Sequence, residues 1–498
     1  MKRPLPPRRG PSGLRTGIGR GPRLAAAFAA SIALAGCRVG PDATEADLDH
    51  RLNERYRHTE PATPVPAEAG LSAWWEGFDD PVMTRLVRRA LVGSLDLAAA
   101  RERIVAARAR RGVVDADRLP QLTAEGSYGY LATGEEALSF NGAPPGVETE
   151  LYALGVVAGW ELDLWGRVGR LVEAADAEIA FAVEDFRAVR VSLAASVARQ
   201  VVTVRALDAE IETVRRGLDA DRDVLSIAEA RQAAGFSDAL DAARAQRVLA
   251  QDLAVLPGLH AERASALLQL DALLGLAPGS VVIEPRGAGP AAAPGSRAAA
   301  LVLDGPLPAA GVPADLLLRR PEVRRAAAAL AAATARVGAA EAERFPRVTL
   351  SGSLRLQGPQ VGDATDWDAR VLQLGPSVSL PLFQGGRIRA NVVRADARRR
   401  ESLALFERAV VEAQREVETA AVRRFRGAER VRRLAAAAAA AVDTETLARD
   451  RYTAGASDFL SVTEAVTTRL GIQRLKVNAE RETLLRLIDL YAALGGGW

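Results

Sequence analysis

The sequence predicts a mainly α-helical chain with a small β part, built as a tandem duplication. The first observation is an internal repeat, because Arg231–Leu240 matches Arg451–Leu460 at an offset of 220 residues, with the same Ala-Gly-x-Ser-Asp punctuation. The second is a pair of proline-free stretches of about 65 residues, at 167–234 and 387–452, each long enough for a helix of roughly 100 Å. The third is a set of four short strand-like segments, two in each half of the chain.

Each half reads as a helix, a strand hairpin, a long helix, a turn and a further helix. In the first half, apolar residues recur at near-helical spacing from Pro81 to Arg118, and Pro120 ends that helix. The remaining elements expected in this half are strands at 122–130 and 152–164 and helices at 167–234 and 238–274.

The second half repeats this order after a connector rich in proline and glycine at 276–315, which is expected to carry a short strand at 281–284. The elements expected in the second half are a helix from Glu322, strands at 348–356 and 372–382, a helix ending at Tyr452, and a helix at 458–494. The match of Ala116–Ser127 with Ala342–Ser353 supports the duplication, since shared helical composition would not reproduce the glycine and proline punctuation. The predicted segments are therefore 1–36, 37–80, 81–275, 276–315 and 316–498.

The first 36 residues have the composition of a removable export signal. They hold seven basic side chains and no acidic one, and they end in a 13-residue apolar run that begins at Leu24. That run is too short to span a bilayer of roughly 30 Å. Without this segment, 58 basic residues face 62 acidic ones, a net charge of −4, so the basic excess of the whole chain does not indicate a nucleic-acid partner.

Leu34–Cys37 resembles a bacterial lipobox, which implies that Cys37 becomes the first residue of the mature chain and carries lipid. Cys37 is the only cysteine, so the chain has no intrachain disulfide and no cysteine zinc cluster. Each methylene of a buried acyl chain contributes about 0.8 kcal/mol to anchoring. Because Arg38 and not an aspartate follows, the expected membrane is the outer one. A plain secretory signal with an incidental cysteine is the alternative.

The predicted strands are about 9–11 residues long, which is the length of a tilted membrane-spanning strand. Four strands cannot close a sheet, and an open edge in lipid leaves backbone groups unpaired. Either the strands form a soluble sheet, or several chains pool them, three chains giving about twelve strands. Aromatic residues near the strand ends are predicted to form an interfacial girdle: Tyr128, Tyr130, Tyr152, Trp160 and Trp165.

The small number of metal-binding side chains and the absence of catalytic motifs argue against a metal protein and an enzyme. Three histidines, two methionines and one cysteine leave little for a soft-metal site. Gly385-Gly386 is not followed by Gly-Lys-Ser/Thr, and the chain contains no Gly-x-Ser-x-Gly elbow. The expectation is no catalytic residue, no metal, and no cofactor other than the covalent lipid on Cys37.

Segments along nearly the whole of residues 37–498 carry a resemblance to a known family. They are Cys37–Asp42, Trp74–Pro81, Trp160–Gly166, Gly311–Arg324, Phe345-Pro346, Leu374–Arg387 and Leu490–Trp498. In this order they resemble the outer membrane factor family of TolC-like channels, and within it the lipoprotein subgroup of the NodT and OprM kind.

The resemblance implies a homotrimer in which each chain gives four long or split helices to a periplasmic α-barrel and four strands to an outer membrane β-barrel of about twelve strands. Such a channel docks on a periplasmic adaptor and an inner-membrane pump, often of the RND type, and passes small molecules outward. The implied location is the outer membrane of a Gram-negative bacterium, with a lipid anchor and an extension into the periplasm. A type I protein-secretion duct of the same fold and a non-conducting, lipid-anchored periplasmic scaffold are the alternatives.

The resemblance also implies a periplasmic gate at the last helix–turn–helix. The family pattern of Arg-Tyr, Gly, aromatic-Leu and an acid falls here on Arg451-Tyr452, Gly455, Phe459-Leu460 and Glu464. Leu460 is then an apolar ring residue and Glu464 an acidic one, although the family often has Asp at the latter position and Arg near position 467, which is threonine here. Three converging glutamates repel, so some protonate or bind cations. The implied adaptor contacts are at the two turns: Gly235, Ser237, Gly455 and Ser457.

Overall fold

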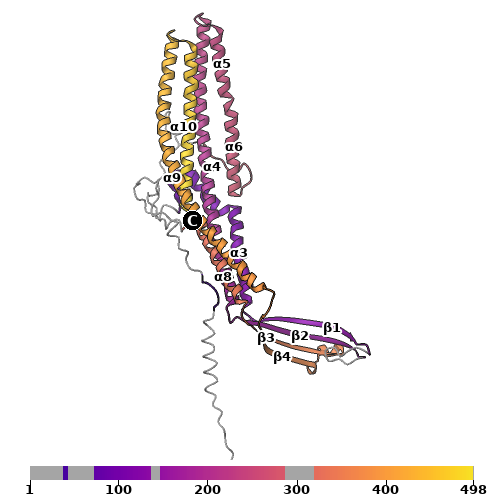
Figure 1. The fold of residues 1–498 in the computed structure, drawn as a ribbon. Helices are drawn as coiled ribbons and strands as arrows, with labels where there is room; N and C mark the ends of the chain where they lie inside the picture. The colour runs from indigo at the N-terminus through magenta and orange to yellow at the C-terminus, as the bar shows by residue number, and fades with distance from the viewer. Residues whose placement is uncertain (1–37, 43–71, 136–145, 286–318, 497–498) are drawn as a thin grey trace, which may run out of the picture. The chain divides into compact units, whose positions relative to one another are not determined.

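The computed structural model describes residues 38–42, 72–135, 146–285 and 319–496 (Figure 1). The elements within these ranges are η1 (Trp74–Phe78), α2 (Pro81–Gly93), α3 (Leu95–Ala116), β1 (Gln121–Ala132), β2 (Glu148–Leu162), α4 (Arg167–Ala233), α5 (Ala239–Leu253), α6 (Val255–Leu274), α8 (Pro321–Ala342), β3 (Arg347–Gly358), η2 (Val361–Ala364), η3 (Trp367–Ala369), β4 (Arg370–Ser379), α9 (Arg387–Thr453) and α10 (Phe459–Ala493). The leader, Cys37, most of the N-terminal arm, most of the connector and Trp498 lie outside the described residues.

Three local expectations differ from the structure. The helix predicted over 81–118 is divided at Ser94, and the helix predicted over 238–274 is divided at Ala254. The strand predicted at 281–284 is wrong, because this segment has no regular structure. The Asp271 carboxylate accepts the backbone N–H groups of Gly279 and Val281, at 2.6 and 2.8 Å, and so ties this segment to α6 instead.

The chain divides into two compact units, and the first contains the sheet. Its described residues are 38–42, 113–135, 146–173 and 335–395. Its strands are all antiparallel neighbours in the order β1-β2-β3-β4, so the hairpin of each half of the sequence lies beside the other (Figure 1). The register pairs Tyr128 with Tyr152 and Trp160 with Leu350.

The second unit is a helical bundle. The long parts of α4, α9 and α10 lie side by side with α5 (Figure 1). Alanine and valine dominate the buried face of α4 around Ala194–Val204, and such small side chains allow helices to approach closely. The 3-10 turn η1 is part of this core, since the Trp74 ring stacks on the Tyr491 ring at 5.3 Å and is 2% exposed. Asp80 then caps α2 by accepting the N–H of Val82 at 2.9 Å.

Candidate functional site

The four-stranded sheet of the first unit has one apolar face. Side chains alternate between the two faces along a strand. In all three strand pairings, even-numbered residues lie opposite even-numbered ones, so the even-numbered residues of the four strands share one face. The aliphatic residues on this face include Leu122, Leu154, Val156, Val348, Leu350, Leu354, Leu356, Leu372, Leu374 and Val378. In the single chain Leu372 and Leu374 are 74% and 75% exposed. An apolar surface of this extent is typical of an interaction with lipid or protein.

The opposite face is mostly small or polar. Its odd-numbered positions carry hydroxyl, amide and charged side chains, among them Thr123, Glu125, Ser127, Thr349, Ser351, Ser353, Arg355, Gln357, Gln373 and Ser377. Arg355 of β3 forms an ion pair with Glu125 of β1 at 3.2 Å, across Gly155 of β2. A Cβ atom on Gly155 would lie 2.5 Å from the Leu354 carbonyl oxygen, so glycine leaves the space that this pair crosses.

Four of the five predicted girdle residues lie on the apolar face, in two tiers. The Tyr128 and Tyr152 rings are 5.0 Å apart near the β1–β2 loop, and Tyr130 is on the same face. Trp160 is near the other end of β2 and donates its Nε1–H to the Arg118 carbonyl at 2.8 Å. The eight steps along the strand from Tyr152 to Trp160 span about 27 Å. This spacing is close to the roughly 25 Å of an apolar band flanked by aromatic residues.

Trp165, the fifth predicted girdle residue, lies outside the strands. It is half-buried in the loop before α4, where its ring stacks on Phe345 at 4.9 Å and its Nε1–H donates to the Pro346 carbonyl at 2.7 Å. Its contacts are therefore those of a packing residue at the base of the sheet, and its part in a girdle stays a prediction.

The two turns of the helical unit share one backbone design. After α4, Gly235 has φ +74° and Phe236 N–H donates to the Arg231 carbonyl; after α9, Gly455 has φ +72° and Ala456 N–H donates to the Arg451 carbonyl. This is the Schellman arrangement, in which glycine takes the left-handed position without strain. The next helices are then capped by aspartates, Asp238 on α5 and Asp458 on α10.

The two turns are tied to one another through Tyr452. Arg231 Nη1 donates to the Tyr452 carbonyl at 2.8 Å, and its guanidinium lies 4.7 Å from the centre of the Tyr452 ring. The Tyr452 hydroxyl donates to Asp241 Oδ2 of α5 at 3.1 Å. Burial raises the pKa of Tyr452 and the Asp241 charge acts in the same direction, so the hydroxyl keeps its proton and remains a donor.

The predicted gate residues lie on one exposed face at the start of α10. Leu460 and Glu464 are four residues apart and both are exposed, Leu460 by 51%, whereas the neighbouring Phe459 is 2% exposed and packs against Tyr452. The predicted adaptor residues Gly235 and Gly455 are exposed, and Ser237 and Ser457 are half-buried. Sequence reasoning missed Phe236, whose ring is 75% exposed in the first turn. A large aromatic residue beside the Ala-Gly pair was the available signal.

A buried charge cluster in the same unit was also missed. Asp221 of α4, Glu445 of α9 and Arg469 of α10 are at most 7% exposed, and Arg469 pairs with Glu445. Among the described residues, none donates a hydrogen bond to either carboxylate oxygen of Asp221. Burial, with a further contribution from Asp252 of α5, raises the pKa of Asp221 to about 7, and burial also raises the pKa of Asp252. These residues come from four helices, so no local pattern brings them together.

Comparison with known proteins now identifies the family. The model described as "Outer membrane efflux protein" matches residues 86–276 and again 312–496. The chain belongs to the outer membrane efflux protein family. It is an outer membrane efflux channel with the TolC-like fold.

Relatives of this efflux protein cover almost its whole length. It is 30% identical over 469 residues to the "Pyoverdine export outer membrane protein OpmQ" of Pseudomonas aeruginosa, covering 88% of this chain and 94% of OpmQ. It is 29% identical to "Nodulation protein T" of Rhizobium leguminosarum bv. trifolii, covering 94% and 96%. The solved structure of the outer-membrane channel OprN superposes with a TM-score of 0.80 at 31% identity, covering 93% of this chain and all of that one.

The described residues of the efflux protein contain neither a membrane-spanning helix nor a cluster of metal ligands. No helix in the described ranges is both long and apolar enough to cross a bilayer. Within the same ranges, no group of three or more His, Cys, Asp or Glu side chains is arranged to hold a metal ion.

Proposed function

We propose that this channel is the exit duct of a tripartite efflux pump, in which an inner-membrane transporter of the RND type passes small molecules through a periplasmic adaptor to the duct. The observation that carries the proposal is the two-faced sheet. Its even-numbered face offers lipid an apolar band between tyrosine and tryptophan tiers, and its odd-numbered face offers water a polar surface. A sheet with these two faces separates lipid from an aqueous path.

The duct is proposed to be a homotrimer. Within the part of the chain that the structure describes, β1 and β4 are the outer strands, each paired on one side. An open strand edge in lipid costs several kcal/mol for each unpaired backbone group. Three copies that join β1 of one chain to β4 of the next would pair these edges and place the Glu125–Arg355 pair toward the water-filled interior.

The paired helical turns are the proposed docking point for the adaptor. They present Gly235, Ser237, Gly455 and Ser457 together with the exposed Phe236 ring, and an exposed aromatic ring is a common anchor in protein interfaces. The hydrogen bonds of Arg231 and Tyr452 join the two turns, so an adaptor that grips one turn also acts on the other.

The proposed gate lies at the start of α10. In a trimer, the exposed Leu460 and Glu464 would converge on the axis as an apolar ring and an acidic ring. The acidic ring favours cations, because three carboxylates without a partner repel each other and attract positive charge.

Small molecules are the proposed cargo, and lipid the proposed anchor. OpmQ is a pyoverdine export protein, and the match covers 94% of its length. This similarity supports a small-molecule duct over a protein-secretion duct. The lipobox at Leu34–Cys37 supports acylation of Cys37, which would hold the channel in the outer membrane of a Gram-negative cell.

The test is planar-bilayer conductance of the purified trimer, wild type beside Glu464→Gln, with Thr467→Ser as the control on the same helix. A duct with an acidic ring predicts small, cation-preferring channels and a lower cation preference in Glu464→Gln only. If the variant conducts like the wild type, the gate assignment fails and the duct stands. If the trimer never conducts and a deletion strain accumulates no more fluorescent dye than its parent, the scaffold hypothesis replaces the duct.

A further inference from the structure

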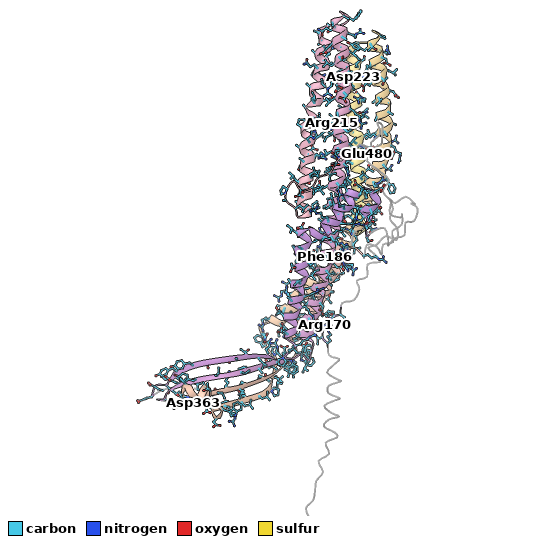
Figure 2. The ribbon with its side chains drawn as sticks, turned by 180° about the vertical axis from the view of Figure 1, so that it is seen from behind. Arg170, Phe186, Arg215, Asp223, Asp363 and Glu480 are labelled. Atoms are coloured by element: carbon cyan, nitrogen blue, oxygen red, sulfur yellow. The ribbon has the colours of Figure 1, made fainter. Side chains whose placement is uncertain are left out.

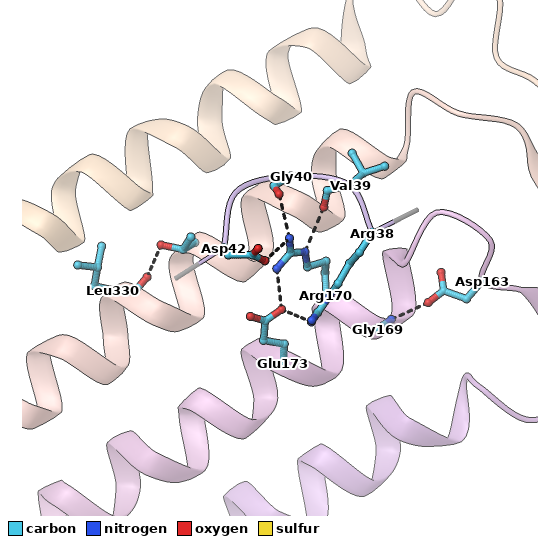
Figure 3. A network of polar contacts seen from close by, with 10 residues as sticks. Arg38, Val39, Gly40, Asp42, Asp163, Gly169, Arg170, Glu173 and Leu330 are labelled. Carbon is cyan, nitrogen blue, oxygen red and sulfur yellow. Dashed lines mark hydrogen bonds and ion pairs between the residues drawn. The ribbon is translucent and has the colours of Figure 1, made fainter. Parts of the chain in front are cut away.

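Arg170, in the first turn of α4, is almost completely buried in the first unit, and neither the sheet faces nor the helical turns use it. Its side chain is 1% exposed. Its guanidinium donates to the Val39 carbonyl at 3.1 Å, to the Gly40 carbonyl at 2.9 Å, and to Glu173 at 2.9 Å (Figure 3). It also forms an ion pair with Asp42 at 2.9 Å. Most of its partners therefore belong to the segment that follows Cys37.

The same segment makes further contacts around Arg170. Arg38 pairs with the Glu173 carboxylate that also binds Arg170, and the Val39 N–H donates to the Trp165 carbonyl at 3.3 Å. Trp165 is itself held by Phe345 and Pro346. Glu173 of α4 thus bridges Arg38, which belongs to residues 38–42, and Arg170, which belongs to α4 (Figure 3).

Two glycines allow the segment to lie flat on α8. Gly40 has φ +94°, and a Cβ atom there would lie 2.3 Å from Gly338 Cα. A Cβ atom on Gly338 would lie 2.8 Å from both the Val39 carbonyl oxygen and Arg170 Nε. Any side chain at position 338 would therefore push the segment off the guanidinium.

The burial of Arg170 explains why these contacts matter. A buried guanidinium is unfavourable unless its N–H groups are satisfied. Glu173 supplies one partner from α4 itself, and the carbonyl groups of Val39 and Gly40 supply two more. The Asp42 side chain is 78% exposed, so its ion pair is screened by solvent and contributes little. The carbonyl groups of residues 39 and 40 thus accept two of the hydrogen bonds that the buried guanidinium needs.

We propose that Arg170 is a positioning residue that docks the lipid-bearing start of the mature chain onto the beginning of α4. Cys37 directly precedes Arg38, one Cα step of about 3.8 Å. Docking of residues 38–42 therefore fixes where the acyl chains leave the protein, close to the point where β2 gives way to α4. The anchor and the apolar face of the sheet are then set at a common depth in the membrane. This inference rests on the proposed acylation of Cys37.

The test is hydrogen–deuterium exchange of the N-terminal peptide in the full-length mature trimer, read by mass spectrometry. The variants are Arg170→Gln, which keeps an amide donor but is shorter and uncharged, and Gly338→Ala, which keeps Arg170 and displaces the Val39 carbonyl. Arg167→Gln is the matched control, because Arg167 lies in the same turn and pairs with Glu161 at 2.9 Å, away from residues 38–42. Trypsin cleavage after Arg38 gives a second readout.

The expected result is faster exchange of the Val39 amide, by about tenfold or more, in both Arg170→Gln and Gly338→Ala. This amide donates to the Trp165 carbonyl and is protected only while the segment stays docked, which the bonds from Arg170 to the Val39 and Gly40 carbonyl oxygens secure. Arg167→Gln should exchange like the wild type. Wild-type exchange in Arg170→Gln, or equal acceleration in all three variants, overturns the proposal. If Arg170→Gln forms no trimer, Arg170→Lys takes its place under the same criteria. The mass of the same peptide reports acylation separately, so an unmodified Cys37 refutes the lipid anchor without deciding the docking.

Discussion

Replacing Asp221 by asparagine is expected to stabilise the channel at pH 8 and to remove part of its pH dependence. Asp221 is 3% exposed, and neither of its carboxylate oxygens accepts a hydrogen bond from the part of the chain that the structure describes. The groups that face it are Asp252 from α5, Glu445 from α9 and Arg469 from α10. Two of these are acids, and Arg469 is already paired with Glu445, so ionised Asp221 is poorly compensated.

The size of the effect follows from the pKa. The pKa of Asp221 rises from its ordinary value of 3.8 to about 7, chiefly because of burial. The folded chain therefore holds a proton that the unfolded chain releases, and stability from this group is full below about pH 4 and falls as pH rises through about 7. A shift of about three pKa units at 1.36 kcal/mol each corresponds to about 4 kcal/mol per chain at pH 8. Asparagine avoids this cost because it is neutral and can donate to Asp252.

The assay is thermal unfolding of the detergent-solubilised protein by circular dichroism at pH 5 and pH 8. The wild type should lose stability between these values, and Asp221→Asn should lose less and unfold at a higher temperature at pH 8. The control is Asp223→Asn, because Asp223 is an exposed residue two positions further along α4 (Figure 2). The reasoning is refuted if Asp221→Asn unfolds at or below the wild-type temperature at pH 8, or if Asp223→Asn reproduces its effect.

Three further predictions concern the sheet and the turns. Leu374→Lys places a charge on the apolar face and should cost roughly 2–4 kcal/mol per chain, so the yield of outer-membrane trimer on semi-native gels should fall, whereas Gln373→Lys on the polar face should assemble normally. Gly155→Val should also lower the yield of trimer on the same gels, because a Cβ atom there would lie 2.5 Å from the Leu354 carbonyl oxygen. A wild-type yield of trimer would show that the sheet tolerates a side chain at this position. Tyr452→Phe removes the hydrogen bond to Asp241, worth about 1 kcal/mol, and should raise the frequency of channel opening in single-channel recordings, with unchanged recordings as the contrary result.

Local signals explain why so many element boundaries could be predicted. Glycine and proline at the ends of the long helices act through backbone conformation, which depends on few neighbours. The helix predicted at 167–234 is observed as Arg167–Ala233, and the strand predicted at 122–130 as Gln121–Ala132. The strand predicted at 281–284 is wrong for the opposite reason. Its apolar run resembles a strand, but the Asp271 carboxylate accepts hydrogen bonds from the backbone N–H groups of Gly279 and Val281. No local sequence pattern predicts that contact.

The sequence alone determined the repeat, the mostly helical class, the four strands and the resemblance to outer membrane channels. These features depend on the periodicity of apolar residues, on the positions of glycine and proline, and on short motifs, all of which are local properties of the sequence. Tertiary structure decided which face each strand residue takes in the common sheet, since pairing register joins Glu125 to Arg355 across 230 positions. It also decided the burial that raises the pKa of Asp221 and the contacts of residues 38–42 with Arg170. Burial and charge at these places come from segments far apart in sequence, and only folding brings them within a few ångströms of one another.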